Sequence, residues 1–86
     1  MQELIEATIS TADGIADCRL DLLQESEGIY AAVILYPHTE DGRQVSKVYE
    51  HRLVHDSGVY RFEESDMVHP KVLAMEQQLS DTILNA

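Results

Sequence analysis

The run from Ile29 to Tyr36, IYAAVILY, constrains the fold of this chain more than any other stretch. All of its residues are apolar or aromatic, and most are β-branched or aromatic types. Residues of this kind favour a β-strand that is at least partly covered on both faces. The run therefore predicts a central strand, and its second face has to be covered either by this chain or by a partner.

Four glycines mark predicted turns at nearly regular intervals. Each glycine follows a turn-prone polar residue, and successive glycines are 14, 14 and 16 residues apart. A two-residue loop that ends in glycine favours a hairpin, because type I′ turns need a positive φ that glycine adopts at little cost. Regular turns of this kind predict an antiparallel meander of five strands. The turn pairs are Asp13-Gly14, Glu27-Gly28, Asp41-Gly42 and Ser57-Gly58.

The first predicted hairpin separates cleanly into two faces. With Asp13-Gly14 as a two-residue turn, the facing pairs on one side are apolar and those on the other side are polar. A half-buried hairpin requires this division, and a one-residue slip would destroy it. The apolar pairs are Ile5 with Leu22, Ala7 with Leu20 and Ile9 with Cys18, and the polar pairs are Glu6 with Asp21, Thr8 with Arg19 and Ser10 with Asp17.

Residues 2–11 also fit a second interpretation, an N-terminal helix in place of the first strand. Their apolar residues recur with a period close to 3.6, as in an amphipathic helix. Thr8 and Ile9 are β-branched and favour a strand, whereas Glu6 and Asp21 would repel each other in the hairpin. We predict the strand and keep the helix as the alternative.

The second predicted hairpin divides the central strand into two sets of side chains. With Glu27-Gly28 as a two-residue turn, Leu22 faces Val33 and Leu20 faces Leu35. Side chains alternate along a strand, so the remaining residues of the run belong to the opposite face. The core set is therefore Ala31, Val33 and Leu35, and the opposite set is Tyr30, Ala32, Ile34 and Tyr36.

Pro37 is expected to end the central strand, because its nitrogen carries no hydrogen to donate. Residues 38–43 are then expected to form a polar loop that turns at Asp41-Gly42.

The last predicted hairpin joins residues 44–54 to residues 59–63. With Ser57-Gly58 as the turn, Leu53 faces Phe62 on the apolar side, and the opposite side pairs Arg52 with Glu63 and Val54 with Arg61. The division is less clean here, because Lys47 and His51 fall on the apolar side. A bulge, or a strand end that runs past the core, would account for them.

From about Val68 to Leu84 the periodicity becomes helical. Apolar residues recur at spacings of four, three, four and four, which places them on one stripe. Ser65 and Asp66 are candidate caps, and Pro70 fits only within the first turn. Such a helix has to be buried, and the predicted core face of the sheet is the surface available to it. The stripe consists of Val68, Val72, Met75, Leu79 and Ile83.

We therefore predict a single α+β domain over residues 1–86, a five-stranded antiparallel meander sheet with one C-terminal amphipathic helix packed on one face. With 86 residues, the chain is at the small end of domains that fold without staples. One cysteine excludes an intrachain disulfide, no apolar run reaches membrane-spanning length, and the N-terminal residues lack the pattern of a signal peptide. The expected localisation is the cytoplasm.

Sixteen acidic residues against six basic ones give a formal net charge of −10. The resulting field would repel nucleic acid, so general phosphate-backbone binding is not expected. The charge is uneven, because residues 1–27 hold seven acids and a single base, Arg19. Four of the other bases are close together in sequence, at Arg43, Lys47, Arg52 and Arg61.

Catalytic and cofactor-binding motifs do not occur in this sequence. His51 and His55 have the spacing that binds zinc on a helix, but four residues of a strand span about 13 Å, too far to share one ion. Cys18 is expected to be a small buried core residue rather than a nucleophile. We therefore expect a protein that is not an enzyme and that holds neither a metal nor a cofactor.

The predicted sheet has one face for which the chain supplies no second helix. Tyrosine, arginine and aliphatic residues meet on that face, and this composition matches protein interfaces. We expect it to bind a partner protein or a second copy of the chain, as in a homodimer, without a membrane or a small molecule. The predicted interface residues are Leu23, Tyr30, Ile34, Tyr36, Val48, Arg52, Val54 and Arg61.

The alternative function is an acidic inhibitor or nucleic-acid mimic that occupies a cationic groove. Five acids in and beside the first hairpin would carry it, and a regular spacing like that of phosphates would support it. They are Glu6, Asp17, Asp21, Glu25 and Glu27.

Overall fold

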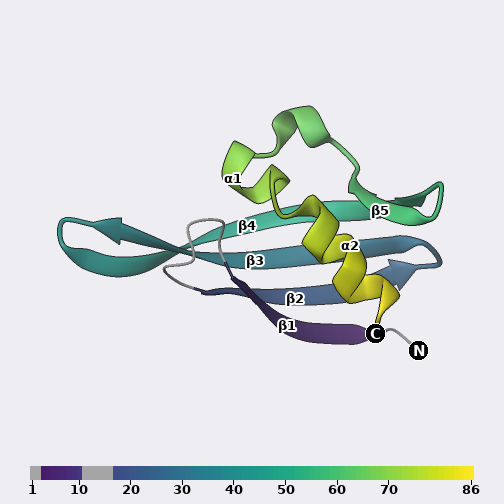
Figure 1. The fold of residues 1–86 in the computed structure, drawn as a ribbon, viewed down its shortest axis with the longest axis horizontal. Helices are drawn as coiled ribbons and strands as arrows, with labels where there is room; N and C mark the ends of the chain where they lie inside the picture. Colours follow the sequence, from purple (N-terminus) through teal and green to yellow (C-terminus); the bar gives the residue numbers. More distant parts are fainter. Residues whose placement is uncertain (1–2, 11–16) are drawn as a thin grey trace.

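A five-stranded antiparallel sheet in the order β1-β2-β3-β4-β5 forms one layer of the protein, and helices cover one face of it (Figure 1). The structure is a computed structural model in which residues 3–10 and 17–86 are described. The predicted α+β meander with a C-terminal helical segment is confirmed. The strands are β1 (Leu4–Ser10), β2 (Asp17–Ser26), β3 (Ile29–Glu40), β4 (Arg43–Asp56) and β5 (Val59–Phe62).

Strands β1 and β2 pair in the predicted register. Ile5 faces Leu22, Ala7 faces Leu20 and Ile9 faces Cys18. Residues 4–10 are a strand, so the alternative N-terminal helix is wrong for them. The Asp13-Gly14 turn and the outermost residues of the predicted segment lie outside the described residues.

Strands β2 and β3 pair one residue away from the predicted register. Leu22 faces Ala32 instead of Val33, and Leu20 faces Ile34 instead of Leu35. The cause is an irregularity between Gln24 and Ser26, where β2 contains one more residue than β3 opposite it. A shift of one residue exchanges the two faces of a strand, so the predicted division of IYAAVILY is reversed.

Strand β3 continues through Pro37 to Glu40, so the predicted strand end at Pro37 and the polar loop after it are wrong. The amide of His55 donates to the carbonyl oxygen of Gly28, which shows that even-numbered residues of β3 direct their backbone groups toward β4. Pro37 is odd-numbered, so its nitrogen faces β2, whose described pairing has already ended at Arg19. Proline at this position removes no ladder hydrogen bond.

The two remaining hairpins turn where glycine predicted. Asp41 and Gly42 both have positive φ, 51° and 76°, and they connect Glu40 directly to its partner Arg43. The last hairpin has the predicted register, with Leu53 opposite Phe62 and Val54 opposite Arg61. The hairpin of β3 and β4 extends beyond the other strands (Figure 1).

The C-terminal segment is interrupted rather than one continuous helix. It contains a 3₁₀ turn η1 (Ser65–Met67), α1 (Pro70–Leu73) and α2 (Glu76–Leu84). The cap of α1 is His69, whose Nδ1 accepts a hydrogen bond from the Lys71 amide at 3.1 Å, instead of the predicted Ser65 or Asp66. Pro70 is the first residue of α1, as predicted. The predicted apolar stripe from Val68 to Ile83 is buried throughout.

The core lies between these helices and one face of the sheet. Helix α2 contacts both β5 and β1, the two edge strands. Two of its side chains accept hydrogen bonds from the outer edge of β5: Ser80 Oγ from the Tyr60 amide and Glu76 Oε2 from the Phe62 amide, each at 2.9 Å. The buried sheet residues are Ile9, Cys18, Leu20, Leu22, Tyr30, Ala32, Ile34, Leu53 and Phe62.

In the described part of the chain, no helix has the length and apolar character needed to cross a membrane.

Candidate functional site

The face of the sheet that points away from the helices is called the open face. Strand register assigns its side chains, because residues that face each other across strands project to the same side. The described helices contribute nothing to this side. Its central residues are Leu4, Glu6 and Thr8 on β1, Arg19, Asp21 and Leu23 on β2, Ala31, Val33 and Leu35 on β3, and Val48, Glu50, Arg52 and Val54 on β4, with Arg61 on β5.

Five of the eight predicted interface residues belong to this face: Leu23, Val48, Arg52, Val54 and Arg61. The other three were assigned to the wrong face. Tyr30 and Ile34 are buried under the helices, with 5% and 0% of their surface exposed, and Tyr36 is half-buried on the same side.

Aromatic contacts fix the misassigned tyrosines on the helix side. The Tyr30 ring meets Tyr60 edge to face with centroids 5.4 Å apart, and the Tyr36 ring meets Tyr49 at 6.5 Å. The residues that take their place on the open face are Ala31, Val33 and Leu35, which had been assigned to the core. The Glu27-Gly28 turn predicts the wrong face for these tyrosines. Counting facing residues outward from Asp41-Gly42 instead pairs Tyr30 with Leu53, which predicts the correct face of β3.

The open face exposes several apolar side chains among its charged ones. Leu4, Leu23 and Val48 are 55%, 37% and 58% exposed, and Val33 and Leu35 are half-buried between them. A shallow hollow of about 350 Å³ lies beside Ala31 between β3 and β4. It is lined by Glu25, Ala31, Ala32, Val33, Glu50, His51 and Arg52.

Arg52 is held in place at one side of the open face. Its Nε lies 3.2 Å from Glu25 Oε1, and its NH1 lies 3.5 Å from Glu63 Oε2. The hydrogen bond and the charge of Glu25, followed by the charge of Glu63, raise the pKa of the Arg52 guanidinium above its ordinary value. Glu25 is the extra residue of the β2 irregularity, so this ion pair fastens the bulged position to β4.

Arg19 and Asp21 lie two residues apart on β2, and each has a polar group without a partner among the described residues. Arg19 is exposed and forms no ion pair with the described residues. Oδ1 of Asp21 is buried and accepts no hydrogen bond from them. Buried polar atoms are normally hydrogen-bonded, so such an atom needs an explanation.

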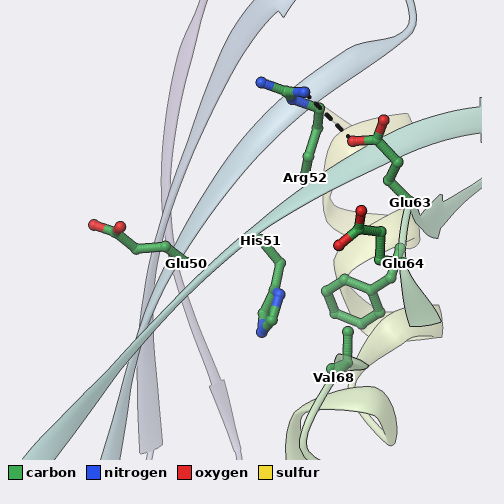
Figure 2. Close-up of a pocket in the computed structure, with 7 residues that line it drawn as sticks. Glu50, His51, Arg52, Glu63, Glu64 and Val68 are labelled. Atoms are coloured by element: carbon green, nitrogen blue, oxygen red, sulfur yellow. Dashed lines mark hydrogen bonds and ion pairs between the residues drawn. The ribbon is translucent and has the colours of Figure 1, made fainter. Parts of the chain in front are cut away.

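A second concave site lies on the helix side, between β4 and the segment that leads into α1 (Figure 2). Its volume is about 240 Å³, and the His51 ring projects toward Phe62 with centroids 5.5 Å apart. Figure 2 shows Glu50 pointing away from this site and Arg52 turned toward Glu63. One imidazole beside scattered carboxylates makes no acid–base pair that could be assigned a reaction.

The other residues considered for chemistry are not brought together. Cys18 is fully buried in the core, as its pairing with Ile9 predicted. Within the two described ranges, no group of three or more histidine, cysteine, aspartate or glutamate side chains is placed to hold a metal ion.

Comparisons of this chain with protein families, with curated proteins and with solved structures find no match.

Proposed function

We propose that this chain is a small acidic interaction domain that binds a protein, either a partner or a second copy of itself, through the open face. The observation that carries the proposal is the exposure of Leu4, Leu23 and Val48 on the face of the sheet that the described helices leave uncovered. Apolar side chains gathered on one surface and bordered by arginines are typical of protein interfaces.

The acidic-mimic alternative has less support from the geometry. Glu6, Asp17 and Asp21 do share the open face, but Arg19 stands between the two aspartates on β2. Glu25 is engaged by Arg52 at 3.2 Å. A surface with alternating charges and exposed aliphatic residues fits a protein of mixed character better than it fits a uniformly cationic groove.

Site-specific photocrosslinking tests the proposal. A benzophenone side chain placed at Val48 projects from the open face, and the same group at Val45 projects from the opposite face of the same strand. The two positions are 58% and 38% exposed, so both probes reach solvent. On irradiation in cells of the native organism, we expect Val48 to give a discrete protein adduct and Val45 to give none.

Equal adducts from both positions, or an adduct from Val45 alone, would contradict the proposal. The absence of any adduct at Val48, with the full-length protein folded and expressed at wild-type level, would do the same. Mass spectrometry of the adduct identifies the captured protein, including a second copy of this chain.

A further inference from the structure

We infer that the free edge of β4 binds an extended segment of another protein, which pairs with it as an added antiparallel strand. This edge runs from Gln44 to Glu50 and includes the protruding end of the β3-β4 hairpin (Figure 1). The site goes beyond the open face, because it consists of backbone groups at the border of the sheet. It does not depend on which molecule the open face binds.

Alternate residues of β4 direct their backbone groups away from β3. The odd-numbered residues bond to β3, as the hydrogen bond from the His55 amide to the Gly28 carbonyl shows, whereas even-numbered Arg52 accepts from the Glu63 amide on the other side. Strand β5 pairs only with residues 53–56 of β4. The even-numbered residues before Arg52 therefore offer N–H and C=O groups that no described residue engages. They are Gln44, Ser46, Val48 and Glu50, and all four are exposed.

The row that β5 occupies is empty beyond Arg52. The chain leaves this row after Glu63 and turns into η1, so no described strand continues beside β4 there (Figure 1). A concavity of about 240 Å³ lies at this point, between β4 and the segment that leads into α1 (Figure 2). It leaves room for the N-terminal end of a strand that runs antiparallel to β4.

Two neighbouring edges of the sheet are protected, whereas this one is not. On β5, Ser80 and Glu76 of α2 accept hydrogen bonds from the outward amides. On the side of β3 that faces away from β4, Pro37 has no N–H to offer. No proline interrupts β4, and its pairing with β3 is continuous from Arg43 to Val54. A regular and unprotected edge of this kind is a template for a further strand.

The side chains along this edge indicate which kind of segment fits. Residues that face each other across antiparallel strands are stabilised as opposite charges or as aromatic and β-branched pairs. Glu50 on the open face favours a basic residue opposite it, and Lys47 on the helix side favours an acidic one. Tyr49 and Val48, which lie between them, favour β-branched residues. The segment that fits is therefore extended and close to neutral, with its basic residue before its acidic one.

A second copy of this chain fits the edge less well. In an antiparallel pairing of β4 with its own copy, Arg43 and Lys47 lie opposite or diagonal to basic side chains of the other β4. Each copy also carries a formal charge of −10, so the two copies repel each other. A near-neutral segment of a different protein avoids both penalties.

A synthetic peptide, acetyl-Lys-Val-Val-Glu-Thr-Val-Thr-amide, tests this inference. Its lysine is designed to lie opposite Glu50 and its glutamate opposite Lys47. NMR titration of the full chain should give a dissociation constant on the order of 100 µM. In the bound state, the amides of Ser46 and Val48 should exchange with solvent at least about 10-fold more slowly, because they become hydrogen-bonded.

Ser46→Pro removes one outward N–H and leaves the β3-β4 ladder intact, as Pro37 does on the strand opposite. It should weaken peptide binding at least about 10-fold, whereas Ser46→Ala keeps the amide and should change it less than about 2-fold. Methylation of the peptide nitrogen opposite Val48 should have the effect of the proline. Methylation of the nitrogen opposite Lys47, which points away from β4, should have little effect.

Circular dichroism checks that both Ser46 variants are folded, and the two methylated peptides decide the question if Ser46→Pro is not. No binding at about 1 mM peptide overturns the inference, and so does binding that neither Ser46→Pro nor methylation opposite Val48 weakens. A dimer that sedimentation detects without peptide and that Ser46→Pro dissociates would assign the edge to a second copy, and would overturn it too. The adduct from the Val48 probe should persist in Ser46→Pro, so the open face and the edge are tested separately.

Discussion

The Tyr30 side chain extends from the core, where its ring is buried, to the edge of the core, where its hydroxyl meets Glu3. Its ring is 5% exposed and packs against Tyr60, while its hydroxyl donates to Glu3 Oε2 at 3.5 Å. Burial, followed by the negative charges of Glu3 and of an ionised Tyr60, raises the pKa of the Tyr30 phenol above 10.0. The folded protein therefore favours the neutral phenol more strongly than the unfolded chain does.

This preference predicts a loss of stability in alkaline solution. Because the pKa is raised in the folded state, its contribution to stability is complete below pH 10.0 and is lost as the pH rises through that value toward the folded pKa. Tyr30→Phe should reduce the alkaline loss, and it should cost less than about 1 kcal/mol near neutral pH, since only one long hydrogen bond disappears.

Urea unfolding followed by circular dichroism, near neutral pH and again above pH 10.0, measures both effects. Glu3→Gln removes the adjacent charge but keeps the phenol, so its alkaline loss should fall between those of wild type and Tyr30→Phe. Identical pH profiles for wild type and Tyr30→Phe would refute this account of Tyr30.

At the scale of elements, α2 takes the place of a sixth strand beside β5. An edge strand leaves every second amide without a partner, and such edges invite pairing with other chains. Ser80 and Glu76 lie one helical turn apart and accept from the Tyr60 and Phe62 amides, which are two residues apart on β5. The helix thereby closes this edge while its apolar stripe covers the core.

Ser80→Ala should reopen part of that edge. It leaves the Tyr60 amide without its acceptor, so we expect a loss of about 1 to 2 kcal/mol in the free energy of unfolding. Thr82→Ala is the matched control, because the Thr82 hydroxyl donates to the Gln78 carbonyl within α2 and not to the edge of β5. Native-state hydrogen exchange should show faster exchange of the Tyr60 amide in Ser80→Ala alone; unchanged protection would refute the role of Ser80.

Most of the elements could be predicted because their signals are local. Alternating apolar residues and the glycine turns determine the strands and the register of the outer hairpins, and the helical stripe ends up buried as its spacing predicts. The break between α1 and α2 could not be predicted, because Ala74 and Met75 carry no helix-breaking signal.

The register between β2 and β3 could not be derived from the Glu27-Gly28 turn. Turn chemistry fixes only the first pair, Ser26 with Ile29, which does have the predicted register. The shift beyond it depends on Glu25, which meets Arg52 from a strand that is distant in sequence. Because both faces of β3 are apolar in this stretch, the sequence of IYAAVILY is compatible with either register. The predicted register therefore places three of the eight interface residues on the wrong side of the sheet.

On the scale of the whole molecule, the protein has one helical layer for a sheet that carries apolar side chains on both faces. The principal extents are 42 × 27 × 19 Å, so the molecule is flat, and its smallest extent spans the sheet and the helical layer. With a formal charge of −10 on 86 residues, copies of the chain repel one another at long range.

The extra residue at Glu25 also has a consequence for the time course of folding. In the observed hairpin Ile34 and Ala32 face Leu20 and Leu22. A hairpin without the extra residue would set Leu35 and Val33 against them, so both registers present apolar β3 side chains to β2. The unshifted hairpin would be a trap that has to open before α2 can dock. Refolding of the wild type should therefore contain a slow phase that a prolyl isomerase does not accelerate.

Val33→Thr distinguishes the two hairpins, because Val33 is half-buried on the open face in the native register, whereas the unshifted register would place the hydroxyl in the core at a cost of about 1 to 3 kcal/mol. Stopped-flow refolding should lose most of its slow phase in this variant and keep it in Val48→Thr, which changes the same face outside that hairpin. A slow phase of equal amplitude in both variants would show that the hairpin has only one way to form.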